Sequence, residues 1–150
     1  MLKMSDRDYD CLKLCNQLCF PLYAASKEIV GRYKPFLDEL GLTYTQYITM
    51  LVVWEHGTVS VRDIGRLLYL DSGTLTPLLK KLEAKRLIER RRDSSDERVL
   101  NVSATEEGLA LRERALAVPH KMACTVGLSQ EEREVLCGIL HKLLGEDRKN

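Results

Sequence analysis

The sequence predicts a mainly α-helical fold of the α+β class, in which a single β-hairpin interrupts a series of helices. Two observations predict it. Apolar residues recur at helical spacing over most of the 150 residues. Alternating apolar and polar residues occur only around one polar loop, at 93–97. With 45% hydrophobic and 30% charged residues, the chain has the composition of one globular domain, long enough to bury ~70% of its unfolded surface.

The N-terminal region is predicted to be helical. Apolar residues keep helical spacing from Leu12 to Leu40, with a break expected at Pro21 and an end near Gly41. Three cysteines occupy this region at intervals of four: Cys11, Cys15 and Cys19. On a continuous helix these positions share one face, so the sequence predicts a stripe of thiols.

Two shorter helices are predicted to follow. Thr43 and Gln46 form a capping-box pattern, which predicts a strongly apolar helix from about Thr45 to Trp54. Ser60 and Asp63 mark the expected start of the next helix. Its apolar positions are Val61, Ile64, Leu67 and Leu68.

A turn is predicted at Asp71, Ser72 and Gly73, before a helix with the sequence TLTPLLKKLEAKR. If this helix begins at Thr74, Pro77 falls in the first turn, where its missing N–H has no intrahelical partner to lose. If it begins at Ser72 instead, we expect Pro77 to distort it.

The hairpin and two further helices complete the predicted fold. LIERRR and RVLNVS are expected to form two strands around the five-residue loop DSSDE. Helices are then predicted from about Thr105 to about Cys124 and from about Ser129 to Leu144. The second opens with Ser129 and Glu132, another capping box.

Basic residues concentrate in one stretch, although the net charge of the chain is only +1. Between Lys80 and Arg92 seven basic residues stand against two acidic ones, Glu83 and Glu89. A local basic block on a near-neutral protein favours a surface that faces a polyanion. A solvated charged face is the simpler alternative.

The order of the elements favours the first interpretation. Two short helices joined by a turn and followed by a basic hairpin are typical of a winged helix-turn-helix. Its second helix enters a major groove, and its hairpin, the wing, reaches an adjacent minor groove. Hydroxyl groups and lysines on that helix suit bases and phosphates, and Asp96 is placed to hold Arg98 for insertion. The predicted DNA-binding residues are Ser72, Thr74, Thr76, Lys80, Lys81, Arg90, Arg91, Arg92, Asp96 and Arg98.

The cysteine stripe has three interpretations: core packing, a metal site or a reactive thiol. Thiols four residues apart on a helix have Cβ atoms ~5–6 Å apart, whereas a disulfide needs ~3.5–4.5 Å. The three histidines are scattered, so we expect no metal site and no cofactor. Cysteine packs well in helices, which makes packing the simplest interpretation of all three thiols.

Cys19 differs from the other two in its surroundings. Pro21 lies two residues later, so the backbone near Cys19 is either a helix start or a kink. A helix start surrounds a thiol with unpaired N–H groups, which favour the thiolate. Tyr23 lies one turn later on the same face and can donate its hydroxyl to that thiolate.

The chain resembles the MarR family of bacterial transcription regulators, and more narrowly the OhrR branch, which senses organic hydroperoxides. The resemblance is carried by NQLCF with Tyr23, and by YKPFLDELGLTYTQY, LVVWE, LYLDSGTLTPLLKKLE and DERV. It runs from about Cys15 to the final helix. It implies one MarR-type domain over residues 1–150, which dimerises through helices at about 8–40 and 105–148. The winged helix-turn-helix at about 44–103 would bind double-stranded operator DNA.

The same resemblance implies a redox mechanism. Cys19 matches the peroxide-reactive cysteine of the family, and Tyr23 and Tyr33 match two tyrosines that bond to it from opposite subunits. Cys124 matches the resolving thiol of the two-cysteine members. We therefore expect a homodimeric repressor that releases its operator when an organic hydroperoxide oxidises Cys19 and a disulfide to Cys124 forms. The remaining thiols are expected to pack in the core, with Cys15 as an alternative resolver: Cys11, Cys15 and Cys137.

Three other functions stay open at this stage. A MarR-type regulator that responds to a small phenolic ligand would have an ordinary, buried Cys19. A thiol peroxidase would leave the basic hairpin unused, and no Arg or Thr constellation for polarising an O–O bond is recognisable, so we expect no catalytic residues and no enzyme. A structural DNA binder is the third. No apolar run approaches the ~20 residues of a membrane span and no signal sequence is apparent, so we expect a cytoplasmic protein that does not bind membranes.

Overall fold

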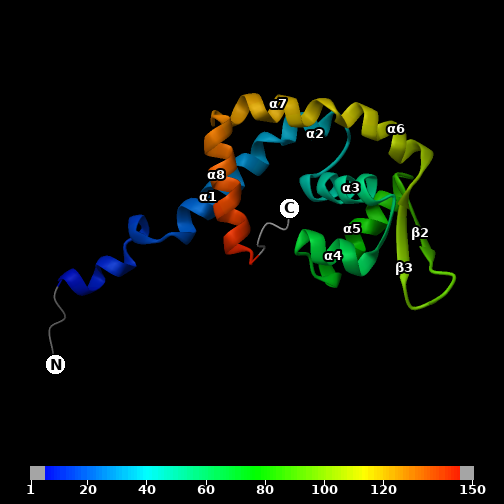
Figure 1. Ribbon diagram of the computed structural model, residues 1–150, viewed down its shortest axis with the longest axis horizontal. Coiled ribbons are helices and arrows are strands. Elements are labelled where there is room, and N and C mark those ends of the chain that lie inside the picture. Colours follow the sequence, from blue (N-terminus) through cyan, green and yellow to red (C-terminus); the bar gives the residue numbers. More distant parts are fainter. Residues whose placement is uncertain (1–5, 146–150) are drawn as a thin grey trace.

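The computed structural model describes residues 6–145 and confirms the mainly α-helical fold (Figure 1). The helices in this range are α1 (Cys19–Arg32), α2 (Lys34–Asp38), α3 (Tyr44–His56), α4 (Val61–Leu68), α5 (Ser72–Ala84), α6 (Glu106–Ala115), α7 (Ala117–Val126) and α8 (Gln130–Leu143). The strands are β1 (Thr58–Ser60), β2 (Ile88–Arg92) and β3 (Leu100–Ala104). Two short 3₁₀ segments, η1 (Asp6–Leu12) and η2 (Leu14–Asn16), precede α1. The predicted end of the last helix at about 148 lies outside the described residues.

A small antiparallel sheet holds the winged unit together. Its strand order is β1-β3-β2, with Val59 of β1 and Arg90 of β2 both paired with Val102 of β3. Val59, Ile88 and Val102 are buried against the helices α3, α4 and α5. The sequence predicted β2 and β3 but not β1, because three residues between two helices carry too little pattern to identify a strand.

The remaining helices form a frame around this unit (Figure 1). α6 and α7 continue from β3 in an arc over the winged unit, and α8 turns back from the end of that arc. α1 and α2 pack against α7, while the segment before α1 projects away from the body of the molecule (Figure 1). The winged unit therefore lies at one end of the molecule and the N-terminal segment at the other.

The helical region predicted over Leu12–Leu40 is interrupted at two places: the break expected near Pro21 is present, and a second interruption, before Pro35, was not predicted. Pro21 and Pro35 both lie in the first turn of a helix, α1 and α2 respectively. A proline ring clashes with the carbonyl four residues earlier if that residue is helical. Gln17, four residues before Pro21, is accordingly extended, with φ −94° and ψ 116°. At Pro35 the rule is not followed in the same way, because Gly31, four residues earlier, is still within α1, which ends at Arg32.

The predicted helix over Thr105–Cys124 is divided in the same way. Pro119 lies in the first turn of α7, and α6 ends at Ala115, the residue whose carbonyl the proline ring would meet. The arc in Figure 1 therefore consists of two helices that meet at Leu116.

Most predicted helix starts are confirmed. The hydroxyls of Thr43 and Ser129 accept the predicted capping-box hydrogen bonds at α3 and α8, and Ser60 caps α4. The turn predicted at 71–73 is wrong: Asp71 is the N-cap and α5 begins at Ser72, so Pro77 lies inside the helix. The helix nevertheless continues to Ala84.

The loop between β2 and β3 is longer than predicted, since it spans residues 93–99. Within the loop the N–H of Val99 donates to the carbonyl of Asp96, and the N–H of Asp93 donates to the carbonyl of Val99. These hydrogen bonds close the loop. No helix among residues 6–145 is long and apolar enough to cross a membrane.

Candidate nucleic-acid interface and thiol site

The helix α5 presents a polar outer face because its apolar residues point inward. Leu75, Leu78, Leu79 and Leu82 are buried, and all five polar residues predicted from this helix are exposed: Ser72, Thr74, Thr76, Lys80 and Lys81. The carboxylate of Asp71 accepts hydrogen bonds from the backbone N–H of Thr74 at 2.9 Å and from its hydroxyl at 3.0 Å. These hydrogen bonds lower the pKa of the Asp71 carboxyl, so the N-cap remains an anion at neutral pH.

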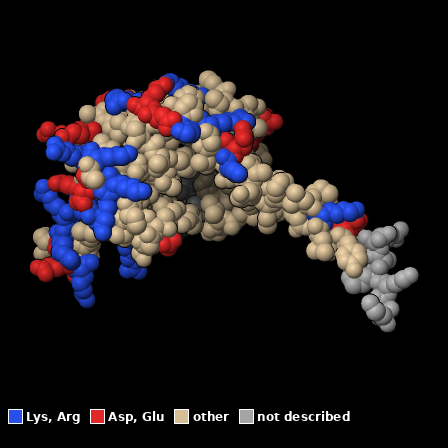
Figure 2. Space-filling model, turned by 180° about the vertical axis from the view of Figure 1, so that it is seen from behind, with Lys and Arg blue, Asp and Glu red and all other residues tan. Residues whose placement is uncertain are grey.

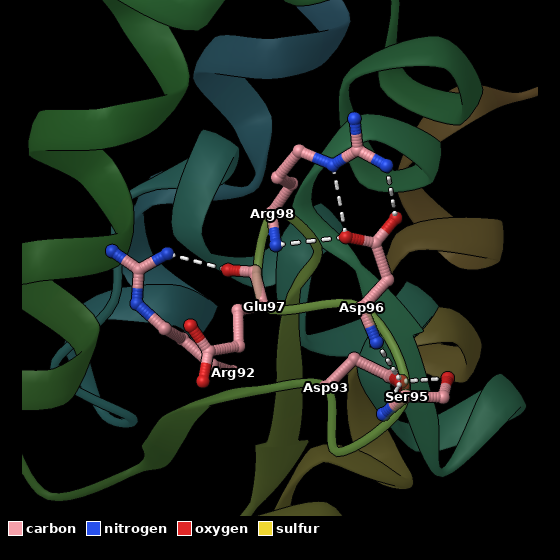
Figure 3. Close-up of polar contacts among 6 residues, drawn as sticks. All are labelled: Arg92, Asp93, Ser95, Asp96, Glu97 and Arg98. Atoms are coloured by element: carbon pink, nitrogen blue, oxygen red, sulfur yellow. Dashed lines mark hydrogen bonds and ion pairs between the residues drawn. The ribbon is translucent and has the colours of Figure 1, made fainter.

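The wing is ordered by two aspartates (Figure 3). One carboxylate oxygen of Asp93 accepts hydrogen bonds from the hydroxyl and backbone N–H of Ser95 and from the N–H of Asp96. The other accepts from the side-chain amide of Asn101, 2.8 Å away. Led by the Ser95 hydroxyl, these donors lower the pKa of the Asp93 carboxyl to about 2.

Asp96 holds Arg98, as the sequence predicted (Figure 3). Its Oδ1 accepts from both the backbone N–H and Nε of Arg98 at 3.1 Å, and its Oδ2 from Nη2 at 3.4 Å. The Arg98 side chain is 92% exposed despite this pairing. The wing therefore presents an exposed guanidinium whose position is held by Asp96.

The three consecutive arginines of β2 have different surroundings. Arg90 forms an ion pair with Glu83 of α5, and its side chain is only 19% exposed. Arg91 pairs with Glu89 on the same strand and stays 77% exposed. Arg92 is exposed and donates through Nη1 to the carbonyl of Glu97 across the wing, at 2.6 Å. Arg91 and Arg92 can contact a polyanion directly, whereas the guanidinium of Arg90 is already paired with Glu83 within the protein.

Lysine and arginine side chains gather at the end of the molecule that carries the winged unit (Figure 2). Acidic residues are interspersed among them, so this end carries charges of both signs, with several projecting cations, rather than a uniformly positive patch. The underside between this end and the N-terminal segment is hollow and lined by uncharged residues (Figure 2).

Cys19 lies at the start of α1, the environment that distinguishes it from the other cysteines. It is the first residue of the helix, and its side chain is exposed. The first amides of a helix have no intrahelical acceptor, so they face the space that an anion at this position would occupy. Tyr23 lies one turn later on α1 and is also exposed.

Tyr33 lies away from Cys19, within a cluster of tyrosines. α1 spans 14 residues between them, or about 20 Å at ~1.5 Å per residue. The ring of Tyr33 lies 5.0 Å from that of Tyr44 and 5.9 Å from that of Tyr47. Burial raises the pKa of all three phenols, with mutual repulsion adding to the effect at Tyr44 and Tyr47. Their hydroxyls therefore remain protonated donors at neutral pH.

Cys124 is exposed near the end of α7. The next residue, Thr125, accepts a hydrogen bond through its carbonyl from Nη1 of Arg32, at the C-terminal end of α1. Cys19 begins α1, so the two thiols of one protomer lie toward opposite ends of that helix. A disulfide requires Cα atoms within ~7 Å of each other.

The core packing predicted for Cys11, Cys15 and Cys137 is wrong within the protomer. All five cysteines are exposed. Cys11 and Cys15 lie in η1 and η2, separate from α1, so the three N-terminal thiols do not share one helix face. Extended backbone at Lys13 separates Cys11 from Cys15, and extended backbone at Gln17 separates both from Cys19.

Large apolar side chains are exposed on the segment before α1, on α1 itself and on α8. They are Leu12, Leu14, Leu18, Phe20, Leu22, Val135, Leu136, Ile139 and Leu143. An apolar surface of this extent is typical of a protein–protein interface.

Sequence reasoning missed Tyr44, Tyr47 and Glu83. The tyrosines follow Tyr33 within YTQY, but their approach to it depends on how α3 packs against the end of α1. Glu83 is one of two acids within the basic stretch, which was the available signal. Among residues 6–145 no group of three or more His, Cys, Asp or Glu side chains could hold a metal ion.

Comparison with known proteins finds that the chain is similar to transcriptional regulators. The family described as transcriptional regulator SarA/Rot matches residues 32–114, which include α2 to α5, the sheet and most of α6. An organic hydroperoxide resistance transcriptional regulator of Bacillus subtilis is 48% identical over 131 residues, which are 87% of this chain and 87% of that protein.

Solved structures show the same similarity in three dimensions. Reduced AbfR of Staphylococcus epidermidis bound to DNA matches with a TM-score of 0.75 and 33% identity, over 94% of this chain and 98% of that one. Overoxidised AbfR bound to DNA matches with a TM-score of 0.73 and 34% identity, over 92% of this chain and 98% of that one.

Proposed function

The chain belongs to the MarR family of transcriptional regulators, in its OhrR-like branch, and on this premise we propose that it is a redox-sensing, homodimeric repressor. It binds operator DNA when reduced and releases it when an organic hydroperoxide oxidises Cys19. The observation that carries the proposal is the exposed thiol of Cys19 in the first turn of α1, on a chain with a winged basic end.

The DNA-binding part of the proposal rests on α5 and the wing. Ser72, Thr76 and Lys80 are exposed on α5, which enters the major groove. Thr74 and Lys81 are also exposed on this helix, and Lys81 is suited to contact a phosphate. The wing contacts the DNA backbone through Arg91 and Arg92 and inserts Arg98, which is paired with Asp96, into the adjacent minor groove.

The proposed homodimer covers the apolar side chains that the protomer leaves exposed. Residues 6–18, the described part of the segment before α1, make no extensive contact with the body of their own protomer, and α8 presents Val135, Ile139 and Leu143 outward. Burying such surfaces against a second copy is favourable by about 25 cal/mol per Å² of apolar area. α1 and α8 are therefore the proposed dimerisation helices.

The proposed chemistry occurs in two balanced steps. The Cys19 thiolate attacks the terminal peroxide oxygen, the O–O bond breaks, and the alkoxide takes a proton and leaves as an alcohol. Sulfur is thereby oxidised to a sulfenic acid. The thiolate of Cys124 then attacks the Cys19 sulfur, a disulfide forms, and the hydroxyl leaves with a proton as water.

The partner subunit supplies the resolving thiol in this scheme. Cys19 and Cys124 of one protomer lie toward opposite ends of α1, which disfavours a bridge within the chain. The same distance supports a role for Tyr33 in trans, where its protonated hydroxyl can donate to the partner's thiolate. Tyr44, 5.0 Å from Tyr33 between ring centroids, is a second candidate donor at that position.

The bridge would release DNA by changing the spacing of the two winged units. α7 carries Cys124 and contacts α1 and α2, so a bond from Cys124 to the partner shifts the frame that carries each α5. Recognition helices must match half-sites about one helical turn apart. A tenfold loss of affinity corresponds to only ~1.4 kcal/mol, which a disulfide can supply.

A second candidate function is regulation by a small ligand, and a cavity favours it. The cavity of about 600 Å³ lies between α3 and the α6–α7 arc. Tyr47, Leu51 and Trp54 supply apolar walls, and Arg112 and His120 are among its polar lining residues. In this alternative a ligand in the cavity, rather than oxidation of Cys19, would move the winged unit.

Fluorescence anisotropy of labelled DNA from the protein's own promoter tests the proposal. The reduced wild type and Cys19→Ser should bind with similar affinity, and near-stoichiometric cumene hydroperoxide should release only the wild type. Cys11→Ser, an exposed thiol in the same region, should respond like the wild type. Release of Cys19→Ser by peroxide would refute the assignment, and release of neither protein would favour the ligand alternative.

A further inference from the structure

We propose that Arg90 is a positioning residue of the wing rather than a phosphate contact: with Glu83 it braces the hairpin against α5 and sets the angle between them. The inference rests on the proposed DNA binding, because the angle matters only if both elements reach DNA. It concerns a contact inside the winged unit that would touch neither DNA groove.

The contact joins two elements that would touch different grooves. Arg90 is the third residue of β2, and Glu83 lies in the last turn of α5. Nε and Nη2 of Arg90 donate to the same carboxylate oxygen of Glu83, at 3.0 Å and 2.5 Å. Two donors from one planar guanidinium fix its orientation as well as its distance.

Burial distinguishes Arg90 from the other wing cations. Its side chain is 19% exposed and that of Glu83 39%, against 77% for Arg91 and 92% for Arg98. The guanidinium end of the pair is therefore shielded from solvent, whereas the Glu83 side chain is about as exposed as Glu89 and Asp96, the acidic partners of the other two pairs, at 41% and 42%. The Arg90 hydrogen bonds also lower the pKa of the Glu83 carboxyl, so the pair stays ionised at neutral pH.

The backbone between α5 and β2 forms a tight joint that the pair spans. Arg86 has φ +58°, the left-handed conformation of a helix C-terminus, and its N–H donates to the carbonyl of Glu83 at 2.8 Å. The N–H of Leu87 donates to the carbonyl of Leu82 at 3.1 Å. This is a Schellman motif, which turns the chain sharply. The Arg90–Glu83 pair then ties the two arms of the turn together.

A fixed angle has a direct consequence for DNA binding. α5 and the wing tip must enter neighbouring grooves at once, and a rigid joint has already lost the freedom that binding would otherwise remove. A loosened joint would weaken binding without removing any contact to a phosphate. A lost phosphate contact would instead release one counterion fewer and reduce the salt slope of log K.

Charge reversal separates the two roles. Glu83→Arg adds a positive charge near the proposed DNA surface, so a purely electrostatic role predicts tighter binding. The brace predicts that Glu83→Arg and Arg90→Glu each weaken operator binding about tenfold, and that the double variant, with the wild-type net charge, recovers most of it. Operator affinity would be measured by anisotropy at several salt concentrations.

Two further variants complete the comparison. Arg90→Lys keeps the charge but loses the two-donor geometry, so it should still weaken binding. Arg91→Met, at the exposed neighbour, should lower the salt slope by about one, whereas Arg90→Met should weaken binding at an unchanged slope. Tighter binding by Glu83→Arg, no recovery in the double variant, or a lower slope for Arg90→Met would each overturn the brace.

Amide hydrogen exchange in the DNA-free protein tests the brace independently of DNA binding. Exchange in β2 and β3 should accelerate in Arg90→Glu and return toward the wild-type rate in the double variant, while Arg91→Met leaves it unchanged. Exchange that is the same in all variants would refute the brace. If the wild-type protein binds no specific DNA but the variants show these changes in exchange, the proposed function fails and the brace stands.

Discussion

Single residues fix the joint where the wing meets the helices that follow it. Gly108 lies in the first turn of α6, and a Cβ built on it would overlap the backbone carbonyl of Leu87, just before β2. The carbonyl of Gly108 accepts a hydrogen bond from Nε1 of Trp54 at 2.9 Å in the core. The absence of a side chain at this position therefore allows α6 to pack directly on the turn that starts the wing.

Gly108→Ala should lower the free energy of unfolding by about 1–3 kcal/mol, because the added methyl group must displace backbone atoms. Chemical denaturation monitored by the fluorescence of Trp54 would measure it. Gly31→Ala is the matched control: its Cβ would meet nothing within 4 Å, and alanine is the better helix former by about 1 kcal/mol. Equal stability of Gly108→Ala and wild type would contradict the packing described here.

At the scale of elements, the sequence predicted features whose signals are local. The caps by Thr43, Ser60 and Ser129 each depend on a hydroxyl and an amide three residues later, and all three are present. The prolines divided the long helices because their effect is equally local, but sequence spacing alone does not reveal where the preceding helix stops. Gln17 illustrates this limit, since its extended backbone separates Cys19, in α1, from Cys11 and Cys15, in the 3₁₀ segments.

The strands of the wing are anchored in the hydrophobic core by Ile88 and Val102, but its loop at 93–99 is ordered by polar side chains, and this loop should therefore respond to acid. Asp93 has an ordinary carboxyl pKa when unfolded, about 3.9, and a folded pKa of about 2. A lowered folded pKa means that the stabilisation is fully present above pH ~4 and is lost as the pH falls through about 2. The Ser95 and Asp96 amides should lose protection from hydrogen exchange in that window.

Asp93→Asn should show weak protection of the Ser95 and Asp96 amides at every pH, because an amide group would face the Asn101 amide donor. Exchange measured by NMR would provide the comparison, with amides of α3 as internal controls. Protection in Asp93→Asn equal to that of the wild type at pH 6 would show that the carboxylate does not order the loop.

At the scale of the whole molecule, the single chain leaves large apolar side chains and all of its thiols exposed. Leu12, Leu18 and Ile139 are more than half exposed, and all five cysteines lie at the surface. The sequence could not predict this exposure, because apolar periodicity marks a buried face without saying whether its own chain or a second copy buries it. The roles proposed for Cys19 and Cys124 came from the resemblance, whereas their separation within one chain required the fold.

The central claim is that Cys19 of one subunit bridges to Cys124 of the other. Its most direct test is a heterodimer, purified through two different tags, that combines one Cys19→Ser chain with one Cys124→Ser chain. Peroxide should link the two chains, and mass spectrometry of a tryptic digest should find peptide 14–27 joined to peptide 122–133, with fragmentation placing the bond at Cys19 rather than Cys15. Neither variant alone should form this bridge. A heterodimer that stays unlinked, while the wild type forms the Cys19–Cys124 bond within one chain, would contradict the account.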